Sequence, residues 1–248
     1  MTLSPPADQF ALSGTFNFRD VGGLRAADGA ITRSGVLLRS AQLSGLDAKG
    51  HETLRALRVS DVHDLRGLPE IDHIGHDSLP EGVRLHVTPF DSRMGEAPPH
   101  EAEEAVSARD HMIEVYRAFP VMPEAAEAII ALANSLVEGD GAALVHCAAG
   151  KDRTGWAVAT LLRAVGVTED DVYTDYLASN AAVEPLRTML EPKIAAGAEL
   201  SDDLLGVQVD YLRTADTTVR ESYGDTEGYL RAIGLTGALR EALRARLI

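Results

Sequence analysis

Short apolar segments alternate along the chain with longer segments in which apolar residues recur every three to four positions. The short segments, at 59–66, 83–90 and 142–147, are typical of strands. The longer ones predict helices after Asp47 and over 101–119, 123–139 and 153–166. Strands that alternate with helices indicate an α/β fold. The residues from Thr168 onward predict a largely helical carboxy-terminal third.

Local signals set several boundaries within this pattern. The dipeptide Asp28-Gly29 lies between segments that can extend, and therefore suggests a hairpin. In the helix after Asp47, we expect Leu54 and Leu57 to face inward. A glycine follows two of the predicted helices, at 139 and 166, where each helix is expected to end. The polar, proline-containing run from 91 to 100 predicts a loop.

The chain contains no internal repeat, low-complexity tract or obvious linker, and 45% of its 248 residues are hydrophobic. A chain of this length can bury a full core, so we expect residues 1–248 to form a single domain. Its 23 basic and 38 acidic residues give a net charge of −15. Such a surface disfavours nucleic acid and anionic membranes as partners, and a phosphorylated substrate would need a local positive site.

Cys147 is the only cysteine of the chain, which excludes an intramolecular disulfide and a cysteine-based zinc cluster. The first residues lack a basic segment followed by an apolar run, and no stretch of the sequence is long and apolar enough to span a bilayer. We therefore expect a cytoplasmic protein without an integral membrane segment. The sequence does not indicate an oligomeric state.

The segment VHCAAGKDRTG lies where an apolar strand is predicted to turn into a helix. The unpaired N–H groups and the positive dipole end of a helix converge on whatever such a loop holds. Cys147 begins the loop and Arg153 ends it, with five residues between them. The peptide N–H groups can ring a tetrahedral anion while the guanidinium grips two of its oxygens. A phosphate fits this description.

The same donors would stabilise a thiolate, so we expect Cys147 to be ionised at neutral pH and able to attack a bound phosphorus atom. The product would be a phosphocysteine intermediate. The hydroxyl of Thr154 could donate to the sulfur when water hydrolyses this intermediate. Gly150 and Gly155 would permit the tight turn and the close approach of helix to strand. We expect no metal and no other cofactor, because the loop supplies the positive field itself.

Three other interpretations of the segment are weaker. A nucleotide-binding P-loop needs Ser or Thr after the lysine and an earlier glycine, but these positions hold Asp152 and Val145. A sulfurtransferase also uses a lone cysteine in a loop, yet an arginine followed by Thr-Gly suits phosphate better. A buried structural cysteine does not account for the surrounding residues in register.

The motif HCAAGKDRTG resembles the C-x5-R signature of cysteine-dependent phosphatases, in the form that carries Lys-Asp before the arginine. It is similar to the bacterial atypical tyrosine and lipid phosphatases typified by mycobacterial protein tyrosine phosphatase B. The similarity extends over nearly the whole chain, through FNFRDVGG, LLRSAQLSGLD, VSDVHDLRGLPE, the strand ending PF, DYLASN and YGDTEGYLRAIGL. It implies a dual-specificity phosphatase fold, with a central sheet flanked by helices. The implied substrates are phosphotyrosine, with phosphoserine, phosphothreonine and phosphoinositides as further candidates.

The resemblance assigns residue roles only where the motif aligns. Cys147 corresponds to the nucleophile and Arg153 to the phosphate clamp. The residues that correspond to the backbone cradle are Ala148, Ala149, Gly150, Lys151 and Asp152.

Residues outside the loop have both a supporting and a purely structural interpretation. Phe18, Arg19 and Asp20 correspond to a segment that we expect to buttress the site, although Arg19 could equally form a structural salt bridge to Asp20 or a neighbouring strand. Paired charges at a strand end often fix a loop, which favours a structural role for Asp64 and Arg66. The remaining candidates, for shaping or supporting the loop, are His146, Tyr176 and Asn180.

Two carboxylates are candidates for the general acid, Asp152 inside the loop and Asp91 at the start of the polar loop. We favour Asp152, because the resemblance supports the loop aspartate; Asp91 could instead cap local backbone N–H groups. Lys151 is either a solvent-facing side chain or a cation suited to a multiply phosphorylated head group.

The region 91–119 is short for the helical lid of this family. The competing hypothesis is a phosphate-recognition module without turnover.

Overall fold

The computed structural model describes residues 12–90, 107–191 and 201–248. The strands are β1 (Arg19–Asp20), β2 (Leu37–Ser40), β3 (Val59–Asp64), β4 (Arg84–Val87) and β5 (Ala142–His146). The α-helices are α1 (Ala48–Ala56), α2 (Leu68–Ile74), α3 (Ala108–Ala118), α4 (Pro123–Glu138), α5 (Arg153–Ala164), α6 (Glu169–Leu177), α7 (Val183–Leu190), α8 (Asp202–Leu205), α9 (Val209–Tyr223), α10 (Thr226–Ala232) and α11 (Gly237–Leu247). Two 3-10 helices, η3 (Phe119–Val121) and η4 (Ala178–Ala182), complete the described elements.

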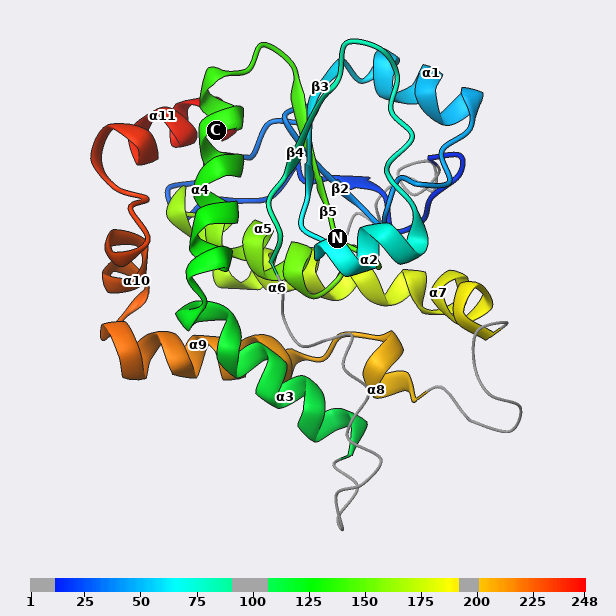
Figure 1. Cartoon of the computed structure of the whole chain (residues 1–248). Helices are drawn as coiled ribbons and strands as arrows, with labels where there is room; N and C mark the ends of the chain where they lie inside the picture. The colour runs from blue at the N-terminus through cyan, green and yellow to red at the C-terminus, as the bar shows by residue number, and fades with distance from the viewer. Residues whose placement is uncertain (1–11, 91–106, 192–200) are drawn as a thin grey trace.

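The five described strands form one sheet in the order β1-β2-β5-β3-β4 (Figure 1). Strands β2, β5, β3 and β4 are parallel, and β1 pairs with β2 in the antiparallel sense. The parallel strands therefore end at one edge of the sheet. In open sheets of this kind, ligands bind outside the carboxyl ends of the strands. The segment after β5, which begins with Cys147, lies at this edge.

Alternating residues of the central strands face two separate cores, because successive side chains of a strand point to opposite faces. In β2, Leu37 belongs to one core and Leu38 to the other; in β5, Val145 and Leu144 divide in the same way. The smaller core lies under α1, which contributes Leu54. The larger core lies under the helices of the second half of the chain.

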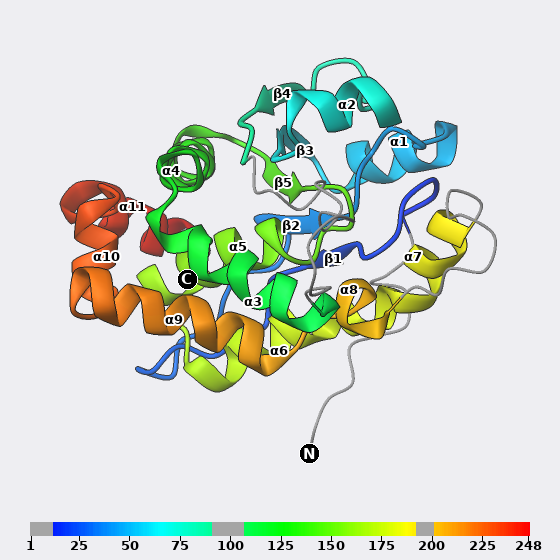
Figure 2. The same ribbon diagram turned by 60° about the horizontal axis from the view of Figure 1, so that its bottom comes forward.

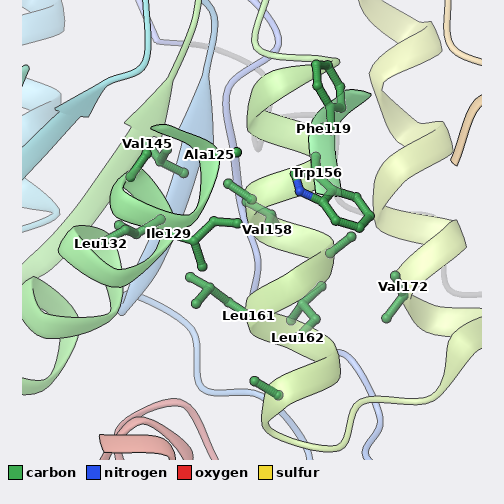
Figure 3. Close-up of a cluster of buried hydrophobic side chains, with 14 of the residues drawn as sticks. Phe119, Ala125, Ile129, Leu132, Val145, Trp156, Val158, Leu161, Leu162 and Val172 are labelled. Atoms are coloured by element: carbon green, nitrogen blue, oxygen red, sulfur yellow. The ribbon is translucent and has the colours of Figure 1, made fainter. Parts of the chain in front are cut away.

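Helix α5 occupies the centre of the larger core. All of its residues except Arg163 are buried. Figure 3 shows Val158 and Leu161 on the side of α5 that faces Ile129 of α4. The helices α3 and α9 lie side by side in front of α5 (Figure 2). This packing fixes the first turn of α5, and with it the loop that precedes the helix.

The α/β class and the helical carboxy-terminal third are confirmed. Helices begin after Asp47 and Thr168, whose side chains accept hydrogen bonds from the first-turn N–H groups of Gly50 and Asp171. In α1, Leu54 is buried, while Leu57 caps the helix and packs at the edge of the smaller core. The predicted strands at 59–66, 83–90 and 142–147 correspond to β3, β4 and β5.

Several boundaries differ from the predictions. The hairpin at Asp28-Gly29 is irregular: Arg25 and Ile31 form an isolated antiparallel bridge, and the backbone of Thr32 also bonds to Gly23 and Leu24. The regular ladder of the two arms is the pairing of β1 with β2. The sequence pattern did not indicate α2 as a separate helix. Helix α3 covers 108–118 of the predicted 101–119, and residues 101–106 lie outside the described part. The single-domain prediction for 1–248 stays a prediction.

No helix among the described residues combines the length and the apolar character that crossing a membrane requires.

Candidate active site

The loop from Cys147 to Asp152 joins the buried strand β5 to the buried first turn of α5. Cys147 is 1% exposed and is the first residue after the strand. Gly150 has a positive φ of 67°, and a Cβ atom there would lie 2.0 Å from the carbonyl oxygen of Ser40. Only glycine fits this close approach to β2 without a shift of the backbone. The predicted role of Gly150 in the tight turn therefore has a clear structural cause.

The carbonyl groups of the loop accept hydrogen bonds from residues outside it. The backbone N–H of Gln42 donates to Ala148 at 3.1 Å. The side-chain amide of Asn17 donates to both Ala149 (2.9 Å) and Gly150 (3.0 Å). Arg39 adds a second donor to the carbonyl of Gly150, at 2.9 Å.

The N–H groups of residues 148–152, in contrast, donate to no acceptor among the described residues. A loop whose carbonyls are held from outside and whose amides are unpaired is a concave array of donors. Such an array, at the start of a helix, is a binding site for an anion. The residues of the predicted cradle, Ala148, Ala149, Gly150, Lys151 and Asp152, thus have N–H groups that are available to an anion. Their binding of substrate stays a prediction.

A buried charge cluster supports the loop from the side of β1 and β2. Asp175 on α6 accepts from Nε of Arg19 at 2.9 Å and from Nη1 of Arg39 at 2.5 Å. Burial raises the pKa of Asp175, but the charges of the two arginines outweigh it and hold that pKa below its usual value. Arg19 also donates to Oδ1 of Asn17, at 2.6 Å, which orients the amide that binds the loop.

The expectation that the segment around Arg19 buttresses the site agrees with this arrangement. The alternative of a salt bridge between Arg19 and Asp20 is wrong, because Arg19 pairs with Asp175. Asp20 instead accepts from the backbone N–H groups of Gly22 and Gly35. Phe18 is buried in the smaller core.

Arg153, the predicted phosphate clamp, is 2% exposed and forms a two-point ion pair with Glu70 of α2. Its two terminal nitrogens, Nη1 and Nη2, donate to the carboxylate oxygens at 2.5 and 2.7 Å. Burial lowers the pKa of Arg153, but Glu70, Cys147 and Asp152 more than compensate and raise it. Its buried Nε has no hydrogen-bond partner among the described residues. One edge of the guanidinium is thus held, and a donor remains for an anion.

Asp152 lies beneath the loop and is 1% exposed. Its Oδ1 accepts from the hydroxyl of Tyr116 at 2.9 Å, and its Oδ2 lies 2.7 Å from Nζ of Lys151. Lys151 is itself 5% exposed and donates to the carbonyl of Gly206 at 3.2 Å. The interpretation of Lys151 as a solvent-facing side chain is therefore wrong.

His146 shapes the base of the loop, as predicted. Its Nδ1 lies 3.2 Å from the carbonyl oxygen of Cys147, and its Nε2 lies 2.8 Å from Asp77. Arg66 bonds to both Asp64 and Asp77 and is fully buried. The predicted structural role of Asp64 and Arg66 is thus in keeping with the contacts. Asp64, Asp77 and His146 could together face a metal ion, but Arg66 already supplies positive charge to both carboxylates.

The remaining candidates from the sequence, among them Thr154, Tyr176 and Gly155, lie in different surroundings. The hydroxyl of Thr154 is buried without a partner among the described residues, next to Arg153. Tyr176 donates to the hydroxyl of Tyr116 at 2.8 Å, and so supports Asp152 from α6. The close approach at Gly155 is to the ring of Tyr176, rather than to a strand as expected.

Asn180 does not contact the loop: its side chain bonds to the backbone of Val207. Asp91 and most of the predicted lid region lie outside the described residues.

Sequence reasoning missed six residues that hold the site: Asn17, Arg39, Glu70, Asp77, Tyr116 and Asp175. Asn17 and Glu70 stood inside the quoted segments FNFRDVGG and DLRGLPE, so a search for polar residues beside the assigned ones could have found them. The only signal of Tyr116 was its position on a predicted helix. Asp77 lies in an irregular segment and gave no signal.

Comparison with known proteins agrees with this geometry. Residues 10–248 match the model of the tyrosine phosphatase family. Triple specificity protein phosphatase PtpB of Mycobacterium tuberculosis is 36% identical over 275 aligned residues, which cover 96% of this chain and 98% of PtpB. A protein of Cupriavidus necator, named among the tyrosine-protein phosphatases, is 31% identical over 87% of this chain and 80% of its own.

The crystal structure of P. aeruginosa TpbA matches with a TM-score of 0.40 at 19% identity, over 82% of this chain and 89% of the other. The match to the family model spans almost all of the chain. The extent of the PtpB alignment is similar. The protein therefore belongs to the tyrosine phosphatase family and is an enzyme of the protein tyrosine phosphatase type.

Proposed function

We propose that the protein hydrolyses phosphotyrosine, and also phosphoserine and phosphothreonine, through a phosphocysteine intermediate on Cys147. The single observation that carries the proposal is the loop of unpaired N–H groups at 148–152. The carbonyls of residues 148–150 accept from donors outside the loop, and those of residues 151 and 152 accept from N–H groups of α5. Cys147 precedes these donors and Arg153 follows them, so a bound phosphoryl group meets a nucleophile and a cation at once.

In the first step, the sulfur of Cys147 attacks phosphorus and the bond to the leaving oxygen breaks. Asp152 gives a proton to that oxygen, which departs as an alcohol or phenol. The loop N–H groups and Arg153 stabilise the charge on the remaining oxygens in the transition state. Once it has given up its proton, Asp152 is ionised and can act as a base in the second step.

In the second step, water attacks the phosphocysteine, Asp152 takes a proton from that water, and the phosphorus–sulfur bond breaks. The unpartnered hydroxyl of Thr154 is available to donate to the departing sulfur. Inorganic phosphate and the starting enzyme result. Asp91 is the alternative acid, and a comparison of Asp91→Asn with Asp152→Asn decides between them. Replacement of the true acid should slow the hydrolysis of alkyl phosphates more than that of an activated aryl phosphate.

The test of the proposal is hydrolysis of a panel of phosphotyrosine, phosphothreonine and phosphoinositide substrates in the presence of a chelator. We expect turnover in chelator by the wild type, and none by Cys147→Ser, which should still bind vanadate through the loop and Arg153. Cleavage by Cys147→Ser at a tenth of the wild-type rate would remove Cys147 as the nucleophile. Binding without turnover by the wild type would favour the competing phosphate-recognition module.

Phosphoinositides are included in the substrate panel because the sequence resembles that of lipid phosphatases. The charge of Lys151 is paired with Asp152 in the interior, so this lysine does not favour a multiply phosphorylated head group. A cytoplasmic location and the exclusion of nucleic acid stay predictions.

A further inference from the structure

The carboxylate of Asp152 is fixed by a hydroxyl from a helix that is distant in the sequence. Tyr116 on α3 donates to Oδ1 at 2.9 Å, across 36 residues of sequence. Both side chains are buried, at 0% and 1% exposure. Lys151, the other partner, belongs to the same loop and donates to the carbonyl of Gly206. Tyr116 is therefore the side chain from outside the loop that bonds directly to the Asp152 carboxylate among the described residues.

The donor direction of Tyr116 is itself set by a second tyrosine. Tyr176 donates to the Tyr116 hydroxyl at 2.8 Å, which leaves the proton of Tyr116 for Asp152. Burial and the negative charge of Asp152 raise the pKa of Tyr116 well above its usual value. Tyr116 therefore remains protonated, and remains a donor, over the whole range in which the enzyme is expected to work.

The ring of Tyr116 is held as firmly as its hydroxyl. It packs against Phe119, Tyr176 and Tyr211, with ring centroids 4.9, 6.2 and 5.6 Å away. An aromatic side chain with two torsions, fixed on three sides, loses little freedom when it holds a ligand group.

We propose that Tyr116 is a positioning residue for proton transfer, which orients the Asp152 carboxyl toward the leaving oxygen and then toward the attacking water. The inference rests on the proposed role of Asp152 in the reaction. Tyr116 acts through Asp152 and does not itself touch the substrate. Because both steps pass a proton through one carboxyl, its orientation affects both.

The ionisable groups around Asp152 come from four elements. They are Lys151 and Arg153 in and after the loop, Tyr116 on α3, Tyr176 on α6 and Tyr211 on α9. Burial raises the pKa of each of these three tyrosines, and the neighbouring acidic groups raise that of Arg153, so none of these four groups is expected to titrate between pH 5 and 8. Cys147 lies in the same loop and attacks both kinds of substrate. A shift of the pH–rate profile on removal of the Tyr116 hydroxyl therefore reports on Asp152 when it appears with the alkyl phosphate and not with the activated aryl phosphate.

The experiment is Tyr116→Phe, which removes one hydroxyl and keeps the packed ring. We expect the turnover of an alkyl phosphate, such as a phosphoserine peptide, to fall about tenfold or more, and that of an activated aryl phosphate to change by less than about twofold. The lost hydroxyl donates to the ionised carboxylate, so its removal should also move the basic limb of the alkyl profile to higher pH.

Two controls separate positioning from packing. Tyr211→Phe removes a buried hydroxyl from the same aromatic group, but that hydroxyl donates to Asp203 instead; its alkyl-to-aryl ratio should match the wild type. In an Asp152→Asn background, Tyr116→Phe should cause no further change in that ratio, because the two residues act as one unit.

An equal loss on both substrates, an unchanged ratio, or the same loss in the Asp152→Asn background would overturn the inference. If Tyr116→Phe does not fold, Tyr176→Phe takes its place, since it leaves Tyr116 in the core and frees its hydroxyl to turn. That variant should show a smaller fall in the same ratio, and an unchanged ratio would again overturn the inference. Absence of wild-type turnover would overturn the proposed function and the inference together, whereas wild-type turnover with an unchanged ratio overturns the inference alone.

Discussion

Arg19 and Arg153 are both buried arginines paired with a carboxylate next to the catalytic loop, yet their surroundings differ. All three nitrogens of Arg19 are engaged, by Asp175, Asn17 and Ser179. Arg153 is held by Glu70 through its two terminal nitrogens only, and its Nε is left unpartnered among the described residues. The first arginine is a completed structural contact, whereas the second keeps a donor for substrate.

The electrostatic surroundings show the same difference. Burial and the neighbouring charge of Arg39 lower the pKa of Arg19 to about 10, because two cations share one carboxylate. Around Arg153 the acidic groups prevail over burial and raise its pKa. Both arginines are cations and can attract a further negative charge. Only Arg153, however, has a nitrogen without a hydrogen-bond partner among the described residues with which to bind it. The comparison shows that one residue type can serve as a completed structural contact at one side of the loop and keep an unpartnered donor at its end, where we propose that phosphate binds.

Asp175→Asn should have the largest effect on stability. It leaves Arg19 and Arg39 buried without a counter-charge, and we expect a loss of about 3–5 kcal/mol in the free energy of unfolding. Urea denaturation measures it. The control is Glu227→Gln, which breaks a two-point pair with Arg240 near the surface and should cost less than about 1 kcal/mol. Similar losses in the two variants would show that Asp175 is not a special support.

Glu70→Gln should act mainly on the anion site. Without the carboxylate, the guanidinium of Arg153 loses its two-point partner and its fixed direction, so vanadate should bind about tenfold more weakly, or about 1.4 kcal/mol. The loss of stability should be smaller than for Asp175→Asn, because the side chain of Glu70 is 27% exposed. Inhibition assays measure the affinity. Glu227→Gln serves again as the control, and unchanged affinity in Glu70→Gln would contradict the assigned role.

The effect of Asp175→Asn should depend on pH in one direction. The pKa of Asp175 is depressed in the folded protein, so the stability that it supplies is present above its unfolded value of about 4 and is lost as the pH falls further. The difference in unfolding free energy between wild type and Asp175→Asn should therefore shrink below about pH 4. Urea denaturation at pH 7, 5, 4 and 3 gives this difference. A constant difference would mean that the ion pairs are not its source.

Asn17→Gly should have the smallest effect. Asn17 has a positive φ of 54°, which glycine adopts without strain. The variant removes the side-chain bonds to Ala149 and Gly150, together with the Oδ1 acceptor of Arg19. We expect vanadate affinity to fall by about threefold, since the backbone of the loop keeps the contact of Arg39. Lower stability with unchanged affinity would mean that Asn17 does not shape the cradle.

The position of the candidate loop between a strand and a helix could be predicted because its residues are contiguous in the sequence. Cys147, Arg153 and the residues between them lie within one strand-to-helix turn, and the strand and helix have clear hydrophobic periodicity. The same holds for the α/β class, since most of the helices and the buried central strands β3 and β5 each carry their own pattern.

The supports of the loop could not be predicted in the same way, because their partners are far apart in the sequence. Asn17 is 132 residues from Ala149, and Glu70 is 83 residues from Arg153. Which side chains meet depends on the register of β2, β3 and β5 and on how α2 is placed. The burial of Lys151 was missed for the same reason, since it depends on the chain at Gly206.

The most direct test of the central claim is to trap the intermediate. Wild-type enzyme mixed with a phosphotyrosine peptide and quenched in acid within the first turnover should carry one phosphoryl group, which peptide mass spectrometry should locate on Cys147. Cys147→Ser under the same conditions should carry none on this peptide. Turnover by the wild type with no phosphoryl group on Cys147, or with one on another residue, would contradict the account.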